Sequence, residues 1–147
     1  MATKRQTILS NIQTIIRAVA IDGEAVFESS SVKLSKQPPS ELATATFPQC
    51  YIYSGPEQRV EDERAVVGKE TWEWIVYLEI WGSDDVMEDI LNAIHSAMFA
   101  DYKFTHTAEW SSRIGADTQT VDPTYQIESM VIPYKVFYRN VNGNMEE

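Results

Sequence analysis

The chain has 147 residues, 44% of them hydrophobic and 23% charged, a composition typical of a folded globular protein and unlike that of a disordered one. Its 22 acidic and 12 basic side chains give a net charge of −10, which argues against duplex DNA binding as the main role because an acidic surface repels phosphates. The single cysteine, Cys50, excludes an intrachain disulfide and favours a reducing compartment.

The charge is uneven along the chain. Residues 1–40 carry five basic and three acidic side chains, a net of +2, whereas the remainder carries seven basic and 19 acidic ones, a net of −12. An acidic body suits a channel through which DNA slides without sticking, although acidic charge is also common in proteins with no such task. No stretch reaches the roughly 20 apolar residues of a membrane span, and the basic start lacks the apolar run of a signal peptide. We therefore expect one soluble domain over residues 1–147.

Apolar residues recur at helical spacing near the start of the chain. The spacing predicts an amphipathic helix over residues 4–20, and Asp22-Gly23 is typical of a helix stop and turn. The predicted buried stripe consists of Ile8, Ile12, Ile15, Ile16 and Val19.

The next part of the chain is less regular. Val26-Phe27 and Val32–Leu34 are predicted as short extended pieces, and Ser29–Ser40 as a long surface connection, because Pro38-Pro39 suits neither a helix nor a central strand. We expect this connection to reach a partner subunit. A short strand follows over Gln49–Tyr53, in which Cys50 is a small core residue.

The most highly charged stretch is Glu57–Glu70, for which a solvated loop and an extended hairpin are both possible. We favour the hairpin, with Gln58–Val60 pairing with Ala65–Val67. Its tip then carries Glu61, Asp62 and Glu63, which suits a partner contact or the lining of a channel. Three adjacent carboxylates do not converge on a metal ion without further ligands.

The sequence Trp72–Trp81 is a strongly predicted strand, around which the other elements can be arranged. One face is wholly apolar and needs to be covered. The other face mixes charge with large aromatic side chains, as subunit contacts often do; alternatively, it packs under a helix or loop of the same chain. The first face carries Trp72, Trp74, Val76, Leu78 and Ile80, and the second carries Glu73, Ile75, Tyr77, Glu79 and Trp81.

A second helix is predicted after the turn Gly82–Asp85, which is expected to cap it, with further acidic residues favouring its positive end. Its buried stripe is predicted as Val86, Ile90, Leu91, Ile94, Ala97 and Met98. Two more strands are predicted over Thr105–Ile114, turned by Gly115–Asp117, and over Tyr125–Tyr138. Pro133 implies an edge position, a bulge or a break in the last strand. Residues 139–147 are expected to form a disordered tail.

No nucleotide-binding, metalloprotease, serine-hydrolase or paired-cysteine motif is present, so we expect no enzyme, catalytic residue, cofactor or metal site. The two histidines, His95 and His106, lack the partners of a zinc site. The predicted fold is α+β, with a mostly antiparallel sheet of four to five strands flanked by two main helices and a projecting charged hairpin.

This order of elements resembles the tail terminator (tail completion) proteins of long-tailed bacteriophages. The residues that carry the resemblance are Ile8–Val19, Phe47–Ile52, Trp74–Asp85 and Ile90–Ile94. The resemblance implies a virion structural protein of the tail and neck, assembled in the host cytoplasm. It implies a homohexameric ring that stacks on the tail-tube protein, terminates tube polymerisation and presents its other face to the neck or connector protein of the capsid. DNA then passes through the ring without specific binding, and no membrane is involved.

In such a ring we expect the subunit or partner interface to use Tyr77 and Trp81 with Arg59 and Arg64, and the acidic tip to face the channel. Two alternatives remain open. One is another head-to-tail neck or connector subunit. The other is a small enzyme or ligand-binding domain whose cleft uses Trp72, Trp110 and His106, which a defined apolar pocket with converging polar groups would favour.

Overall fold

The computed structural model describes residues 3–36, 45–60, 69–105 and 107–141. Its elements in chain order are α1 (Lys4–Arg17), β1 (Ala20–Ile21), β2 (Glu24–Ala25), the 3₁₀ turn η1 (Ser29–Ser31), β3 (Val32–Lys33), β4 (Gln49–Val60), β5 (Lys69–Ser83), α2 (Met87–Ala100), β6 (Trp110–Arg113), β7 (Asp117–Asp122) and β8 (Ile127–Val141). The fold is α+β, as predicted, but its main sheet has six strands where four to five were expected.

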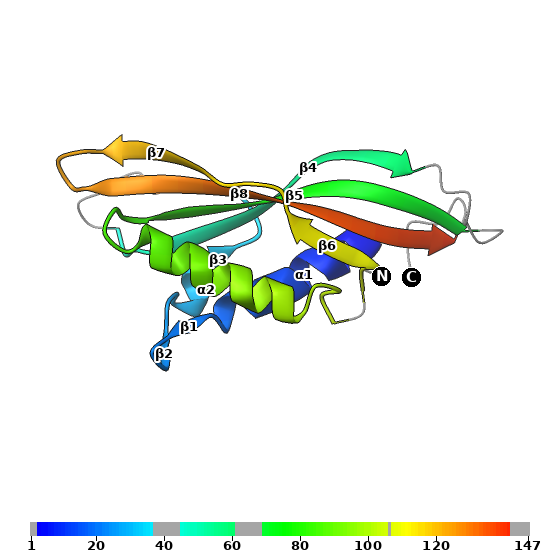
Figure 1. Ribbon diagram of the computed structural model, residues 1–147, viewed down its shortest axis with the longest axis horizontal. Coiled ribbons are helices and arrows are strands. Elements are labelled where there is room, and N and C mark those ends of the chain that lie inside the picture. The colour runs from blue at the N-terminus through cyan, green and yellow to red at the C-terminus, as the bar shows by residue number, and fades with distance from the viewer. Residues whose placement is uncertain (1–2, 37–44, 61–68, 106, 142–147) are drawn as a thin grey trace.

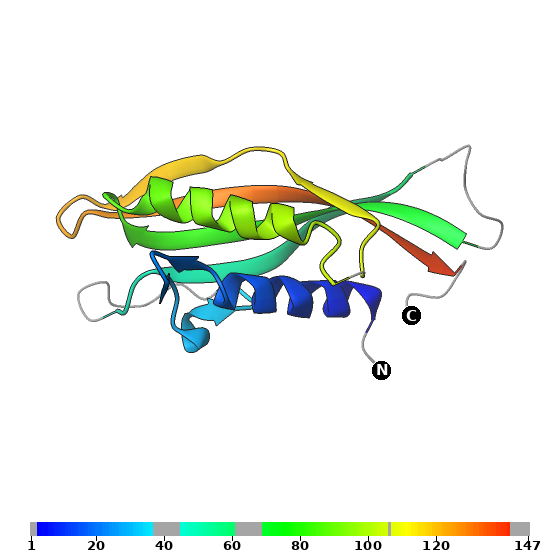
Figure 2. The ribbon, with the colours of Figure 1, turned by 60° about the horizontal axis from the view of Figure 1, so that its bottom comes forward.

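The main sheet has the order β3-β4-β5-β8, and both β6 and β7 pair with the remaining side of β8. All pairs are antiparallel except the short parallel pair of β3 and β4. The two helices lie on the same face of this sheet (Figure 1, Figure 2). At one end of the molecule β4, β5 and β8 extend past the helices, which forms the projection predicted from the sequence (Figure 1).

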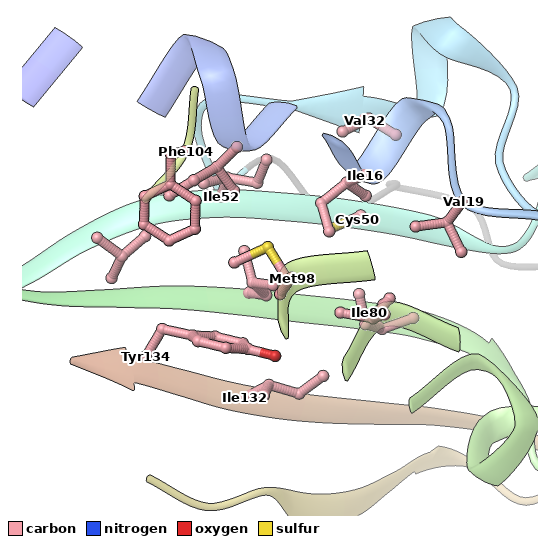
Figure 3. Packing of buried hydrophobic residues seen from close by; sticks show 14 of the residues in the cluster. Ile16, Val19, Val32, Cys50, Ile52, Ile80, Met98, Phe104, Ile132 and Tyr134 are labelled. Carbon is pink, nitrogen blue, oxygen red and sulfur yellow. The ribbon is translucent and has the colours of Figure 1, made fainter. Parts of the chain in front are cut away.

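The core lies between the helices and the sheet. The apolar face of β5 is buried as predicted, with Trp74, Val76, Leu78 and Ile80 fully inaccessible. In Figure 3, Ile16 of α1 points toward Cys50 of β4, which confirms that the cysteine is a core residue. Burial raises the pKa of its thiol, and the negative charge of Glu79 adds to the effect, so this thiol is unreactive. The other fully buried large side chains of this core include Ile8, Ile12, Ile52, Ile94, Met98 and Phe104.

The first helix begins at a capping box. The hydroxyl of Thr3 accepts a hydrogen bond from the backbone of Gln6 at 3.2 Å, and the Gln6 side chain accepts one from the backbone of Thr3 at 2.9 Å. The helix ends at Arg17, before the predicted end at residue 20. Asp22 and Gly23 both have positive φ and form the two-residue turn between β1 and β2. They make the predicted turn but do not stop the helix.

The second helix lacks the predicted side-chain cap. Val86 is the N-cap and forms no capping bond, and the Ser83 hydroxyl donates to Asp85 at 2.6 Å instead. Val86, which was predicted to be buried, is 38% exposed, and the next residue, Met87, is buried instead. The acidic residues Glu88 and Asp89 do lie in the first turn, where they favour the positive end of the helix.

The β4–β5 hairpin has a different register from the predicted one. Gln58–Val60 pairs with Thr71–Glu73, and residues 61–68, which include the predicted partners Ala65–Val67, lie outside the described residues. The register follows from the long ladder that begins at Gln49↔Trp81 and continues along both strands. A bulge shifts this ladder by one residue between Ser54 and Glu57.

Pro133 lies inside β8, which runs without the predicted edge position, bulge or break and pairs Pro133 with Tyr77 of β5. The interruption is in the neighbouring strand, between β6 and β7. The carbonyl oxygen of Pro133 accepts a hydrogen bond from the backbone of Ile114 at 3.0 Å, just after β6 ends and before β7 begins. The donor that a proline lacks would point to this same side, where the neighbouring strand is interrupted. Gly115 therefore does not reverse the chain as predicted; β6 and β7 both run antiparallel to β8.

Two boundaries also differ from the prediction. The strand expected over Thr105–Ile114 is reduced to Trp110–Arg113. β8 continues to Val141, opposite Lys69, so residues 139–141 belong to the sheet and not to a tail. Residues 142–147 lie outside the described part of the chain.

Candidate functional site

One face of the sheet carries no helix among the described residues, and we call it the open face (Figure 2). Because side chains alternate along a strand, every second residue of β5 points to this face. These residues are Glu73, Ile75, Tyr77, Glu79 and Trp81. Both helices lie on the opposite side, so neither of them covers this row. The segment that leaves β3 does reach this face, because Lys36 contacts Glu79 of the row and Tyr53 of the neighbouring strand β4.

Glu79 is the centre of a polar cluster on the open face. Its side chain is nearly inaccessible, and it accepts hydrogen bonds from the Tyr53 hydroxyl at 3.0 Å and the Trp81 indole at 2.8 Å. The Lys36 ammonium lies 3.2 Å from the same carboxylate and 5.7 Å from the centre of the Tyr53 ring. A buried carboxylate is stable only when it is paired in this way. The cluster therefore holds together three segments of the open face.

The tyrosines around Glu79 resist ionisation. Burial raises the pKa of Tyr51 to about 12, and the charge of Glu79 adds to the effect. Burial is also the main cause of the raised pKa of Tyr53, and the hydrogen bond to Glu79 is the second cause. The rings make edge and tilted contacts, with centroids 6.4 Å apart for Tyr51 and Trp81 and 5.4 Å apart for Tyr53 and Tyr77. At neutral pH both hydroxyls are uncharged, and the partly exposed rings of Tyr53, Tyr77 and Trp81 surround the buried Tyr51 and Glu79.

Further along the same face, Glu73 joins two neighbouring strands. It forms an ion pair with Lys135 of β8 at 3.1 Å and accepts a hydrogen bond from Gln58 of β4 at 3.2 Å. The hydrogen bond from Lys135 is the main cause that lowers the pKa of this carboxyl, followed by the bond from Gln58. The open face therefore changes from aromatic near Trp81 to charged near the projecting end.

The structure separates residues that we expected to act together. Tyr77 and Trp81 share the open face, but Arg59 lies opposite Trp72 on the helix side. The reason is the bulge after Ser54, because an extra residue in β4 reverses the direction of every side chain that follows. Arg64 and the tip residues Glu61, Asp62 and Glu63 lie outside the described residues.

Sequence reasoning missed Lys36 and Tyr53 as members of the open-face cluster. Tyr53 alternates with Cys50 and Ile52, a signal that places it on the far side from the core. No local pattern links Lys36 to Glu79, because 43 positions separate them and the contact depends on the parallel pairing of β3 with β4. A pairing of this kind is not visible in a single sequence.

On the helix side of the projecting end, Arg5 of α1 connects the helix to the strands. Its guanidinium lies 3.5 Å from the Glu57 carboxylate and 4.6 Å from the centre of the Trp74 ring. The Tyr138 hydroxyl donates to the same carboxylate. This arrangement of one cation, one anion and two aromatic rings fixes the base of the projection against α1.

A groove of about 440 Å³ lies between the C-terminal half of α2 and the edge strand β6. It is lined by His95, Met98, Phe99, Tyr102, Trp110, Ser111, Ser112, Arg113 and Tyr134. The Tyr134 hydroxyl is buried without a hydrogen-bond partner among the described residues. Burial raises the pKa of Tyr134 to about 12, against a lowering effect of the Arg113 charge. Of the cleft residues predicted for a ligand-binding domain, only Trp110 lines this groove; Trp72 donates to Glu70 instead, and His106 is not described.

Within the described residues, no group of three or more His, Cys, Asp or Glu side chains is placed to hold a metal ion. No helix in this part of the chain has the length and apolar character needed to cross a membrane.

Comparison with known proteins finds a likeness in fold but none in sequence. No protein-family model matches the sequence, and no curated protein matches it either. Among solved structures, the fold is similar to that of a chain in the structure described as "Virion of native gene transfer agent (GTA) particle". The two chains are 12% identical, the match covers 90% of this chain and 94% of that chain, and the TM-score is 0.50. At this identity the likeness establishes a shared fold over nearly the whole chain.

Proposed function

We propose that the protein is a virion structural protein that forms a ring, caps a phage-like tail tube, terminates its polymerisation and joins the tail to the neck. The observation that carries this proposal is the fold that the chain shares, over 90% of its length, with a chain of the gene transfer agent virion. The order of elements in the sequence, which resembles tail terminators, supports the same role independently. The protein acts by assembly and not by catalysis, as a homohexamer that contacts the tail-tube protein on one side and a neck or connector protein on the other.

The shape of the protein suits this role. A cyclic ring needs a rigid body and two different surfaces per subunit, and ring stacking needs further surfaces above and below. The helix-covered half of the sheet supplies the body. The projecting end of β4, β5 and β8 and the open face with Tyr77 and Trp81 are the surfaces we assign to partners (Figure 1). Aromatic side chains beside charged ones are typical of protein interfaces.

The bulge in β4 divides the predicted interface into two surfaces. Tyr77 and Trp81 contact one partner from the open face, whereas Arg59 belongs to a contact on the helix side. Arg64 remains a proposed contact residue without an assigned face. We retain the acidic tip of Glu61, Asp62 and Glu63 as the element that faces the channel. The net charge of −10 favours passage of DNA without adhesion.

The first experiment is the mass of the purified protein by light scattering, with negative-stain imaging, at two salt concentrations. We expect rings of six copies. Purified protein is then added to polymerising tail-tube subunits, and the length of the tubes is measured. Capping predicts shorter tubes with a ring at one end, and tubes of unchanged length without added density would refute the role.

A second candidate, a small ligand-binding domain, is favoured by the groove between α2 and β6, in which the Tyr134 hydroxyl and Arg113 accompany apolar side chains. Native mass spectrometry of the freshly purified protein separates the two functions. A ligand-binding domain retains a bound small molecule as a monomer, whereas a ring subunit gives the mass of the bare chain and of its multiples.

A further inference from the structure

The groove between α2 and β6 is an apolar surface with several exposed aromatic side chains. Phe99 is 73% exposed, Trp110 46% and Tyr102 41%, and all three line the groove. β6 is also an outer strand of the sheet, since its only strand partner among the described residues is β8. Several large aromatic side chains exposed together beside a free strand edge are typical of a site that another protein covers.

The charge of the groove is opposite to that of most of the protein. Its lining contains the cationic side chain of Arg113 and no carboxylate, although the chain has 22 acidic residues. Tyr134 forms part of the lining, but its hydroxyl is buried and has no hydrogen-bond partner among the described residues, so the polar character of the groove comes from Arg113, His95 and the serines. The partner that fits such a surface therefore presents an aromatic or apolar side chain accompanied by carboxylates.

The turn between β7 and β8 has these properties. Tyr125 at its tip is 53% exposed, and the hairpin from Asp117 to Glu128 carries three acidic side chains and no lysine or arginine. Asp122 shapes the turn by accepting a hydrogen bond from the backbone of Thr124 at 2.8 Å. The hairpin lies at one end of the long axis of the molecule, away from β6 (Figure 1). A copy of the chain thus cannot fill its own groove with it, whereas a neighbouring copy can.

We propose that the groove receives the β7–β8 hairpin of a neighbouring copy, with Tyr125 entering between Phe99 and Trp110 and Glu128 approaching Arg113. This inference rests on the proposed ring and names the contact that closes it. The contact joins two different surfaces of the same chain, so each copy offers a groove to one neighbour and a hairpin to the other. Head-to-tail contacts of this kind generate closed rings when the rotation between neighbours closes, and helical filaments when it does not. A groove-to-groove dimer would instead bring like charges together.

Cysteine pairing tests the contact directly, because Cys50 is fully buried and will not react. A Phe99→Cys variant and a Tyr125→Cys variant are mixed at high concentration under mild oxidation, with and without tail-tube protein. We expect a covalent dimer in the mixture and not with either variant alone. The matched control pairs Tyr125→Cys with Leu34→Cys, another exposed apolar position, and no dimer is expected.

Charge exchange provides the second test. Arg113→Glu and Glu128→Lys are each expected to weaken self-association by at least about tenfold. An equimolar mixture of the two variants, or one chain carrying both changes, is expected to restore it, because every contact then pairs opposite charges again. Circular dichroism melting confirms that each variant is folded.

The outcomes separate this contact from the proposed function. Hexameric rings without the Phe99–Tyr125 crosslink would overturn the contact while leaving the ring in place. A monomer that neither crosslinks nor shortens tail tubes would overturn both. A small molecule retained by the wild-type protein and lost on Phe99→Cys substitution would assign the groove to a ligand and overturn the contact.

Discussion

The ring of Tyr77 lies against Gly55 across the β4–β5 pair, so closely that a Cβ atom on Gly55 would stand 2.4 Å from Cε2 of the ring. The same Cβ would be 3.1 Å from the carbonyl oxygen of Ile75. Gly55 lies in the bulge of β4, next to the aromatic part of the open face, and the side chains after this bulge point to the opposite faces of the sheet from those expected without it. The side chain of Tyr77 and the path of β4 therefore depend on each other.

Substitution of Gly55 by alanine is predicted to lower the free energy of unfolding by about 1–3 kcal/mol, because the added methyl group overpacks this site. Urea unfolding measures the change. Gly115→Ala is the matched control, since nothing lies within 4 Å of a Cβ there, and we expect its effect to stay within about 0.5 kcal/mol. Equal effects at the two glycines would mean that Tyr77 moves aside without cost.

Glu79→Gln is predicted to destabilise the protein by about 1–3 kcal/mol, because the charge that three donors surround is removed from a buried site. The pKa of Tyr53 is expected to fall in this variant, since its hydrogen bond to the carboxylate contributes to the raised value while burial remains. Ultraviolet titration of tyrosine measures it. Lys36→Met, which removes only the exposed cation, should cost less stability than Glu79→Gln. The reverse order would show that the ion pair, and not the hydrogen-bond cluster, holds the open face.

Stability is predicted to fall as the pH rises from about 10 to about 12. Tyr51 and Tyr134 have pKa values of about 12 in the folded protein, whereas tyrosine in an unfolded chain ionises near pH 10. Their contribution is complete below pH 10 and disappears as the unfolded chain loses these protons more readily than the folded one. Urea midpoints across this range measure the loss. Tyr51→Phe should reduce the slope, and Tyr102→Phe, at an exposed tyrosine, should not.

The open face is predicted to bind a partner of the assembled tail. Ile75→Arg places a charge in the middle of this face and should weaken binding to tail-tube protein by at least about tenfold. Val86→Arg, an exposed apolar position at the start of α2, is the control. Co-sedimentation with preformed tubes measures both. Unchanged binding by the Ile75 variant would move the tube contact to another surface, while retained rings in both variants would show that assembly itself is intact.

Much of the core was predictable because burial follows periodicity. Most of the predicted stripes of α1 and α2 and the apolar face of β5 are buried or partly buried, since apolar side chains at helix or strand spacing have to leave water together. Val86 is the exception, because α2 begins at Met87, which is buried in its place. Element ends were less predictable. The predicted side-chain cap of α2 does not form, and Ser83 bonds to Asp85 instead. Asp22-Gly23 forms the turn between β1 and β2, beyond the end of α1.

The candidate surfaces were only partly predictable. Alternation along β5 placed Tyr77 and Trp81 on one face, whereas the face on which Arg59 lies depends on the bulge in β4, which no local pattern indicates. The break between β6 and β7 that accommodates Pro133, and the groove beside Trp110, also depend on how β8 is paired.

The sequence by itself determined which side chains leave water: the helix stripes, the alternating row of β5 and the lone thiol of Cys50. Their burial follows from the spacing of apolar residues along the chain, which can be read without knowing how the elements pack. Only the tertiary structure decided which polar and aromatic groups meet, as Lys36 does with Glu79 and as Arg5 does with Glu57. These contacts depend on the register of paired strands, because a shift of a single residue places a side chain on the opposite face of the sheet.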